Sequence, residues 1–257
     1  MTRNEGFEER IAVARQTMRC FFEGEGKSDQ DKKLPQPPLA KERMSQEEPI
    51  ALSRDFRAVV CESDYLTVLD TRRSCWRFAD EDMTLDQLSF LLWSSQGVQR
   101  STGARTQRPA PSGGARHPFE TYIAARRVQG LAQGLYHYLP MTHELEFLRP
   151  LEEWDPVIAD SLMGQAHHAH ASAVVYWACM AYRGEWRYSV FSHRVMLMDV
   201  GHLCQNFYLS ATAAGLAACG IAAYDQKVCD DLFGLDGEEE YTTYCASVGL
   251  RYARTAE

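Results

Sequence analysis

The sequence lacks the features that mark membrane-spanning and secreted proteins. No apolar run approaches the roughly 18 to 20 residues that a bilayer-spanning helix needs, and the opening residues MTRNEGFEER contain no hydrophobic signal segment. The cysteines form no C-x-x-C motif and no paired metal-ligand spacing, and the three histidines of residues 167–170 lack a further ligand nearby. We therefore expect a cytoplasmic protein with reduced, mostly buried thiols and no metal site.

An excess of basic charge is also missing. The chain has 27 Lys and Arg against 35 Asp and Glu, which gives a net charge of −8. A negative overall field repels nucleic acids and anionic membranes, so we expect neither as a partner. Any anionic ligand must instead be met by a local cluster of arginines. The hydrophobic fraction of 45% and the charged fraction of 24% are typical of a folded globular domain.

Residues 1–49 are expected to form a region apart from the main domain. Residues 7–22 predict an amphipathic helix, and residues 23–49 are rich in Lys, Asp, Glu, Gln and Pro, a composition that does not pack a core. We expect an extended arm there, either a solvated linker or a segment that wraps a partner subunit. The folded domain is expected over residues 50–257.

The order of elements in that domain predicts an α+β fold without internal repeats. Residues 63–73 predict a helix with Ser63 as N-cap, and Thr84 and Gln87 have the capping-box pattern that opens a second helix. Residues 98–118 predict a loop. Strands are expected over residues 119–126, 134–139, 144–148, 173–180, 216–221 and 241–248, and further helices over 156–168, 189–214 and 227–233.

Two segments about 35 residues apart carry most of the chemical information. Residues 71–78 (TRRSCWRF) offer three guanidiniums and a hydroxyl at the end of a helical pattern, and residues 111–118 (PSGGARHP) offer unhindered backbone amides between prolines. Taken singly, an arginine pair at a helix end ordinarily compensates the helix dipole, and a Gly-Gly pair is ordinarily a turn. Together they fit a phosphorylated, planar cofactor.

These segments resemble the nitroreductase superfamily and, within it, the SagB-type dehydrogenases, which include the FMN-dependent azoline oxidases. The resemblance runs from about residue 60 to 250. Its segments, in family order, are 72–78 (RRSCWRF), 111–118 (PSGGARHP), 134–138 (GLYHY), 201–206 (GHLCQN) and 215–225 (GLAACGIAAYD). The resemblance implies a nitroreductase-like fold, with a central antiparallel-rich mixed sheet flanked by helices. It also implies an intertwined homodimer whose two flavin sites lie at the interface and are each built from both chains.

The resemblance implies FMN as the cofactor. Arg72, Arg73 and Ser74 match the phosphate-binding signature, and guanidiniums hold a phosphate with charge-assisted hydrogen bonds. Arg77 matches a position beside the pyrimidine edge of the flavin, where a cation stabilises the reduced ring. For Arg251, a phosphate contact and a solvated terminal charge both stay open. The other implied flavin contacts are Pro111, Ser112, Gly113, Gly114, Gly220 and Ile221.

The residues expected on the substrate side depart from the family pattern. SagB-type azoline oxidases have a Lys-Tyr pair ahead of the Gly-His helix as the source of the base, and the matching pair here is Arg187 and Tyr188. A guanidinium keeps its proton, so Arg187 is expected to contact an anion or a carbonyl instead. Tyr188 is the expected acid or base, because a neighbouring guanidinium favours the phenolate. The loss of Lys leaves open whether azoline oxidation is retained.

The resemblance implies an FMN-dependent oxidoreductase. Its expected substrate is a small-molecule, peptide or carrier-bound biosynthetic intermediate that loses two hydrogens, with azoline to azole as the leading case and O2 as the electron acceptor. Biosynthetic enzymes are its expected further partners. Two alternatives stay open: an NAD(P)H-dependent reductase of nitro, quinone or enone compounds, and a non-catalytic scaffold subunit of a biosynthetic complex.

Overall fold

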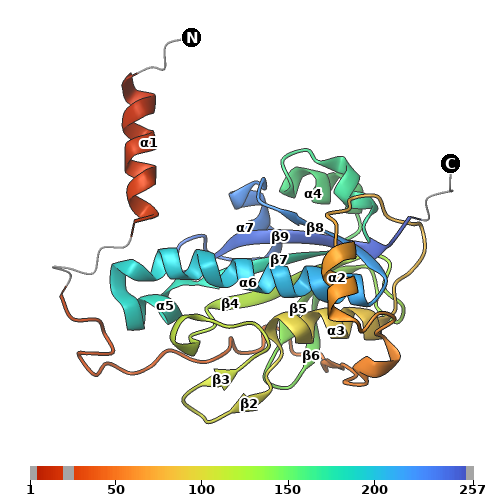
Figure 1. The fold of residues 1–257 in the computed structure, drawn as a ribbon, viewed down its shortest axis with the longest axis horizontal. Helices are drawn as coiled ribbons and strands as arrows, with labels where there is room; N and C mark the ends of the chain where they lie inside the picture. The colour runs from red at the N-terminus through yellow and green to blue at the C-terminus, as the bar shows by residue number, and fades with distance from the viewer. Residues whose placement is uncertain (1–4, 20–25, 253–257) are drawn as a thin grey trace.

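The computed structural model describes residues 5–19 and 26–252, and its centre is a seven-stranded sheet (Figure 1). The strand order is β1-β6-β5-β4-β7-β9-β8, and each pair of neighbouring strands is antiparallel. Parallel contacts occur as isolated bridges, one of them between Ser74 and Ala218. The strands are β1 (Ile50–Ala51), β4 (Phe119–Ala125), β5 (Gly134–Leu139), β6 (Glu144–Pro150), β7 (Ala173–Met180), β8 (Leu216–Ile221) and β9 (Glu240–Leu250). A separate ladder pairs β2 (Arg100–Ser101) with β3 (Thr106–Gln107).

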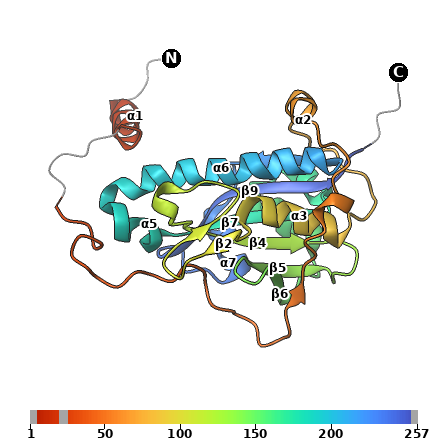
Figure 2. The same ribbon diagram turned by 60° about the horizontal axis from the view of Figure 1, so that its bottom comes forward.

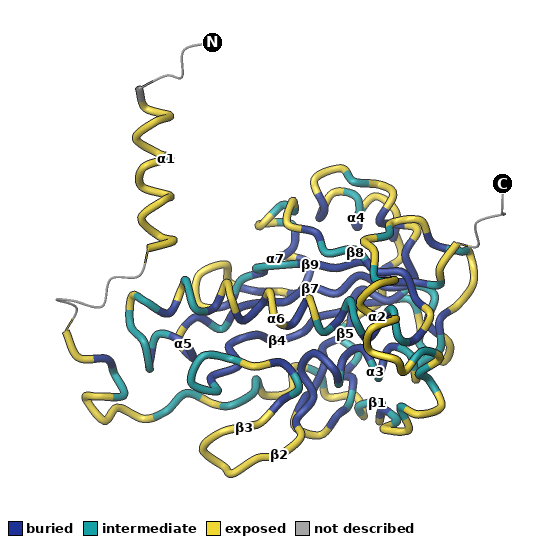
Figure 3. The backbone as a smooth tube through the Cα atoms, viewed as in Figure 1, coloured by how far each residue is buried: buried dark blue, intermediate teal, exposed yellow. Residues whose placement is uncertain are grey.

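Helices cover both faces of the sheet, which gives three layers. Helices α3 (Leu85–Gln96) and α6 (Ser192–Ala213) pack on one face, and α4 (Trp154–Ser161) and α7 (Gln226–Phe233) pack on the other. Successive strand residues point to opposite faces, so strands covered on both sides are apolar throughout. Every residue of β4 is buried, and Figure 3 shows the central strands as a continuous buried block.

Local hydrogen bonds explain where the first domain helices begin. The predicted capping box is confirmed: the amide of Gln87 donates to Thr84 Oγ1 at 3.0 Å, and the amide of Thr84 donates to Gln87 Oε1 at 2.9 Å. The predicted N-cap at Ser63 is wrong. Helix α2 (Tyr65–Thr71) is capped by Asp64, whose carboxylate accepts from the amide of Thr67 at 2.8 Å. Asp is as good an N-cap as Ser, and here it lies one residue closer to the apolar pattern.

Two predicted helices have different bounds in the structure. The long helix expected over residues 189–214 begins with a 3-10 turn at 189–191 and continues as α6. A separate helix, α5 (Ala181–Tyr188), precedes it and was not predicted; it ends where Ser189 has a positive φ of 49°. The helix expected over 156–168 ends at Ser161, since residues 163 and 164 also have positive φ, and residues 166–170 form a 3-10 helix. Helix α1 (Glu5–Thr17) overlaps the helix predicted over 7–22 but begins two residues earlier, and residues 20–22 of that prediction lie outside the described part.

The described part of the N-terminal arm, residues 26–49, lies extended along its own domain (Figure 2). The backbone amide of Lys41 donates to Glu120 at 2.8 Å, and the amides of Met44 and Ser45 donate to Glu146 at 2.8 and 2.9 Å. Lys41 also forms an ion pair with Glu240 of β9. The solvated-linker interpretation is therefore wrong for these residues, while contact with a partner subunit stays a prediction.

No helix within residues 5–19 and 26–252 is both long enough and apolar enough to cross a bilayer.

Candidate active site

The first predicted cofactor segment and the Gly220 segment meet around Tyr208 of α6. Ser74 Oγ lies 3.0 Å from the Tyr208 hydroxyl, and the amide of Gly220 donates to the same hydroxyl at 2.5 Å. The guanidinium of Arg72 lies 5.3 Å from the centroid of the Tyr208 ring, a cation–π distance. Ile221 follows Gly220 in β8 and is buried. The structure thus brings the two segments together through a tyrosine that the sequence analysis missed.

Among the described residues, the arginines of this group have no acidic side chain as a partner. Arg73 donates to the backbone oxygens of Asp70 at 2.6 Å and Arg72 at 2.8 Å, which is the helix-end role of an arginine pair. Arg77 and Arg251 are exposed, and a β-bridge from Arg251 to the residue after Arg77 brings them close. Within the described part, none of these four guanidiniums forms an ion pair with a carboxylate. This set of uncompensated cations fits the phosphate of FMN.

The glycine-rich segment is held by a buried carboxylate on α6. The hydroxyl of Ser112 donates to Asp199 Oδ2 at 2.6 Å, and the amide of Gly113 donates to Asp199 Oδ1 at 3.0 Å. Burial raises the pKa of Asp199 and outweighs these two hydrogen bonds, which lower it. The Gly113 amide therefore has a protein partner, and its approach to a flavin stays a prediction. An acidic residue within the apolar pattern of residues 189–214 was the available signal for Asp199.

The two glycines are required by neighbouring side chains of the same chain. A Cβ on Gly113 would lie 2.3 Å from Cγ1 of Val195, and a Cβ on Gly114 would lie 2.3 Å from Nε of Arg187 and 2.6 Å from the hydroxyl of Tyr188. Gly114 also has a positive φ of 59°, which favours glycine. The predicted catalytic pair, Arg187 and Tyr188, thus lies against the predicted cofactor loop. The guanidinium of Arg187 covers the Tyr188 ring at 5.3 Å from its centroid.

The predicted site residues form two groups at different points along α6. The group around Asp199 contains Ser112, Gly113, Gly114, Arg187 and Tyr188, with exposed Pro111 at its edge. The group around Tyr208 contains the Arg72 segment and Gly220. Nine residues at 1.5 Å per residue place Asp199 and Tyr208 about 14 Å apart along the helix axis. One chain therefore presents two partial sites.

The N-terminal arm contacts α5 and helps to position it. The sequence analysis predicted neither this helix nor its contact with the arm. The amide of Gln30 donates to the backbone oxygen of Trp186 at 2.8 Å, and Gln30 Oε1 accepts from Nη1 of Arg187 at 3.0 Å. Trp186 Nε1 donates to the backbone oxygen of Leu34 at 3.0 Å. A glutamine in a polar, proline-rich segment gives no periodic signal, so nothing in the sequence pointed to this contact.

Residues 69–250 match the model of the nitroreductase family. The match covers most of the chain, and the chain therefore belongs to this family.

Three proteins show the range of its relatives. The chain is 34% identical over 162 residues to MJ1384 of Methanocaldococcus jannaschii, which is named as a nitroreductase; the match covers 63% of this chain and 80% of that protein. It is 29% identical over 145 residues to the trifolitoxin-processing protein TfxB of Rhizobium leguminosarum bv. trifolii, covering 53% and 38% of the two chains. It is 27% identical over 143 residues to the microcin B17-processing protein McbC of Escherichia coli, covering 51% and 49%. The chain thus spans less than half of the latter two proteins.

Solved structures confirm the predicted nitroreductase-like fold. A crystal structure from Ralstonia eutropha, named as a nitroreductase, matches with a TM-score of 0.67 and 24% identity, covering 86% of this chain and 100% of that one. A chain of the E. coli microcin synthetase McbBCD complex with truncated pro-MccB17 bound matches with a TM-score of 0.62 and 19% identity, covering 96% and 93%. At these identities the likeness shows the fold alone, and the predicted homodimer stays a prediction.

Proposed function

We propose that this nitroreductase-family oxidoreductase is an FMN-dependent dehydrogenase of SagB type. Its proposed substrate is a heterocyclic, peptidic or carrier-bound intermediate of natural-product biosynthesis, with azoline to azole as the leading reaction. The observation that supports this function best is the contact of Arg187 and Tyr188 with the Gly114 loop, because it joins the predicted catalytic pair to a predicted cofactor segment. The similarity to two proteins named for processing trifolitoxin and microcin B17 supports a peptidic intermediate.

The residues proposed to hold FMN are those with uncompensated positive charge and those next to Tyr208. Arg72, Arg73, Ser74 and Arg251 would bind its phosphate, and Arg77 would lie at its pyrimidine edge. The backbone of Gly220 and Ile221 and the loop of Pro111, Ser112, Gly113 and Gly114 would contact its ring. When bound, FMN supplies a hydride acceptor.

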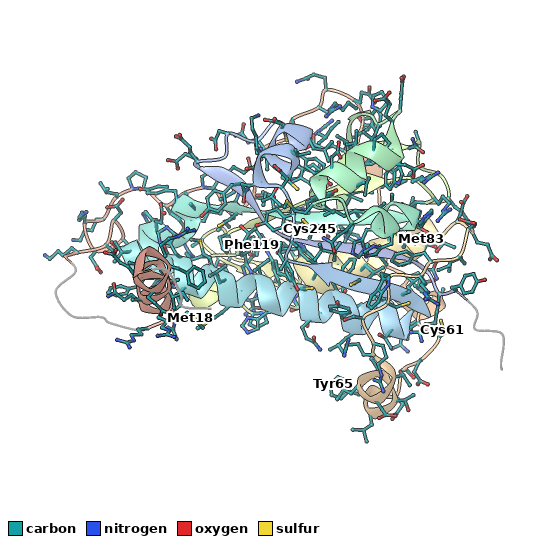
Figure 4. All side chains as sticks on the ribbon, turned by 90° about the horizontal axis from the view of Figure 1, so that it is seen from above. Met18, Cys61, Tyr65, Met83, Phe119 and Cys245 are labelled. Carbon is teal, nitrogen blue, oxygen red and sulfur yellow. The ribbon has the colours of Figure 1, made fainter. Side chains whose placement is uncertain are left out.

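We propose that the site is completed in a homodimer. On the stretch of α6 that carries Asp199, Leu197 is 63% exposed and Met198 is 47% exposed, and a Cβ on the nearby Gly201 would meet no atom within 4 Å. Helix α2 projects from the body with Tyr65 and Leu66 exposed (Figure 4). Apolar faces of this kind mark interaction sites. If α6 of a second copy packed antiparallel to α6 of the first, the Tyr208 group of one subunit would lie next to the Asp199 group of the other.

In this proposal, Tyr188 moves the proton. In this step Tyr188 acts as the phenolate: the substrate gives one hydrogen as a proton to the phenolate oxygen and the other as a hydride, so the two electrons leave with the hydride. Arg187 lies over the Tyr188 ring and stabilises negative charge on the phenol oxygen. Gln30 holds Arg187 in this position from the arm.

Spectroscopy and turnover together test the proposal. The purified protein is expected to show a flavin absorption band, and a thiazoline is expected to lose two hydrogens in an O2-dependent reaction without NAD(P)H. Steady NAD(P)H consumption with a nitro compound or quinone, and no thiazoline turnover, would support the reductase alternative. A colourless protein that cannot be reconstituted with FMN would contradict the proposal and support the scaffold alternative.

A further inference from the structure

The glycine-rich segment carries a buried cation that no carboxylate neutralises. Arg116 is only 5% exposed, and its Nε donates to the backbone oxygen of Gly114 at 3.2 Å. Its guanidinium lies 5.3 Å from the centroid of the Trp186 ring. Burial lowers the pKa of Arg116, and the positive charges of Arg187 and Arg105 lower it further. Tyr188 acts in the opposite direction and raises this pKa, and it is a phenol and not a carboxylate.

A second guanidinium reaches the same loop from α5. The side chain of Arg187 lies directly against Gly114, as its contacts with a Cβ there demonstrate. Its Nη1 donates to the neutral side chain of Gln30, and its Nε is buried without a hydrogen-bond partner. Two cations therefore converge on Gly114, and within residues 5–19 and 26–252 neither has an acidic partner.

Other buried arginines in this chain are compensated. Arg183 is 4% exposed and forms an ion pair with Glu120. Arg108 is 7% exposed; it donates to Gln96 Oε1 at 2.9 Å, and the charge of Glu120 supports its protonated form. Burying a charge without a counter-charge is costly. The carboxylate on the adjoining stretch of α6 is Asp199, which is engaged by the loop backbone and does not pair with either arginine. The Arg116–Arg187 pair therefore lacks an anion.

We infer that Arg116 and Arg187 form a subsite for an oxyanion beside Tyr188, and that this subsite takes a carboxylate or a phosphate carried by the substrate. Planar guanidiniums bind both groups with charge-assisted, bidentate hydrogen bonds. The inference rests on the proposed function, because it takes Tyr188 as the acid or base. The anion would belong either to the heterocycle itself, as a carboxylate, or to the arm of a carrier, as a phosphate.

Matched acid and ester ligands test the subsite in the FMN-loaded protein. 2-Phenylthiazole-4-carboxylate and its methyl ester share one ring and differ in charge, and their affinities can be measured by titration calorimetry. We expect the acid to bind at least about tenfold more tightly than the ester, with a preference that falls as KCl is raised. Arg116→Gln and Arg187→Gln should each reduce the preference and leave the FMN content unchanged. Arg57→Gln, which removes an exposed cation elsewhere, should leave the preference intact.

The source of the anion follows from a second pair of ligands, pantetheine and 4′-phosphopantetheine. A tighter phosphorylated ligand, with the gain lost in the same two variants, would assign the subsite to a carrier arm. A gain confined to the thiazole acid would assign it to the heterocycle.

Two results would overturn the inference. One is equal affinity for acid and ester in the native protein, which requires no variant to fold. The other is loss of FMN from Arg116→Gln, which would assign the cation to the cofactor. A colourless protein that cannot be reconstituted with FMN would contradict the proposed function instead. Failure of the inference and failure of the proposed function are therefore distinguishable.

Discussion

The buried carboxylate of Asp199 accepts a hydrogen bond of 2.6 Å from the hydroxyl of Ser112. This bond joins the glycine-rich loop to the long helix that also carries Tyr208, so both partial sites depend on the position of α6. The loop in turn fixes the surroundings of Arg187 and Tyr188 through Gly114.

Replacing Asp199 tests how far the loop depends on it. Asp199→Ala leaves the Gly113 amide and the Ser112 hydroxyl without their acceptor, and should lower the free energy of unfolding by about 1–3 kcal/mol. Asp199→Asn keeps one acceptor oxygen and should lose less. Urea denaturation measures both, and equal stability of the three proteins would contradict the role given to Asp199.

The cationic segment should govern flavin retention. Arg72→Ala or Arg73→Ala removes a charge-assisted hydrogen bond worth about 1.5–3 kcal/mol, which corresponds to FMN binding weaker by about tenfold or more. Flavin fluorescence on dilution gives the dissociation constant. Arg57→Ala is the control, since it removes the same charge from an exposed position outside both groups.

Tyr188→Phe separates chemistry from cofactor binding. The phenyl ring keeps its packing under Arg187, so the protein should stay yellow, while the loss of the hydroxyl should slow flavin reduction by substrate by about 100-fold or more. Stopped-flow absorbance follows this step. Tyr182→Phe is the control, because Tyr182 is an exposed tyrosine on the same helix as Tyr188 and its hydroxyl bonds to Asp29 of the arm. This variant should react at the native rate. An unchanged rate in Tyr188→Phe would exclude it as the acid or base.

The arm should contribute measurable stability through Lys41. Lys41→Met leaves Glu240, whose side chain is 9% exposed, without its cation and should cost about 1–3 kcal/mol of unfolding free energy. Lys227→Met breaks an ion pair between exposed side chains and should lower the free energy of unfolding much less. Thermal unfolding of the two variants compares them directly, and equal losses would show that the arm is only weakly coupled to the domain.

Acidification should destabilise the fold through His117. Burial, followed by the charge of Arg108, lowers the pKa of His117 to about 3 from an ordinary value of 6.5. Between these values the unfolded chain binds a proton that the folded chain does not, so the free energy of unfolding falls as pH falls from 6.5 toward 3. Burial lowers the pKa of His168 to about 4 and acts in the same direction. His117→Gln should flatten this dependence in chemical denaturation between pH 6.5 and 4.

Local patterns in the sequence predicted six of the seven strands of the sheet, and the two-residue β1 was missed. Each predicted strand is present with bounds within two residues, because the apolar and β-branched runs that define strands are local. Helix α5 was missed because its inward side includes Arg183, which is buried only because Glu120 neutralises it. Glu120 lies on strand β4, so the sequence pattern of α5 itself does not reveal this partner.

The candidate site was predictable by segment but not by contact. The segments around Ser74 and Gly114 were identified from residue types, and the Arg187 segment was identified from the resemblance to SagB-type dehydrogenases. In contrast, Tyr208 and Asp199 bond to Ser74 and Ser112, which lie more than 80 residues away in sequence. The composition of the arm indicated a solvated segment because its side chains are polar. Its docking instead uses backbone amides bonded to buried carboxylates, which composition does not reveal.

The pairing of Lys41 with Glu240 joins residues 199 positions apart and sets an order for folding. The carboxylates that receive the arm come from β4, β6 and β9, so they are brought together only after the sheet has assembled. Closing so long a loop is entropically costly and slow. We therefore expect the arm to reach its native position after the sheet has formed, and α5 to acquire its final contacts with the arm only at that step.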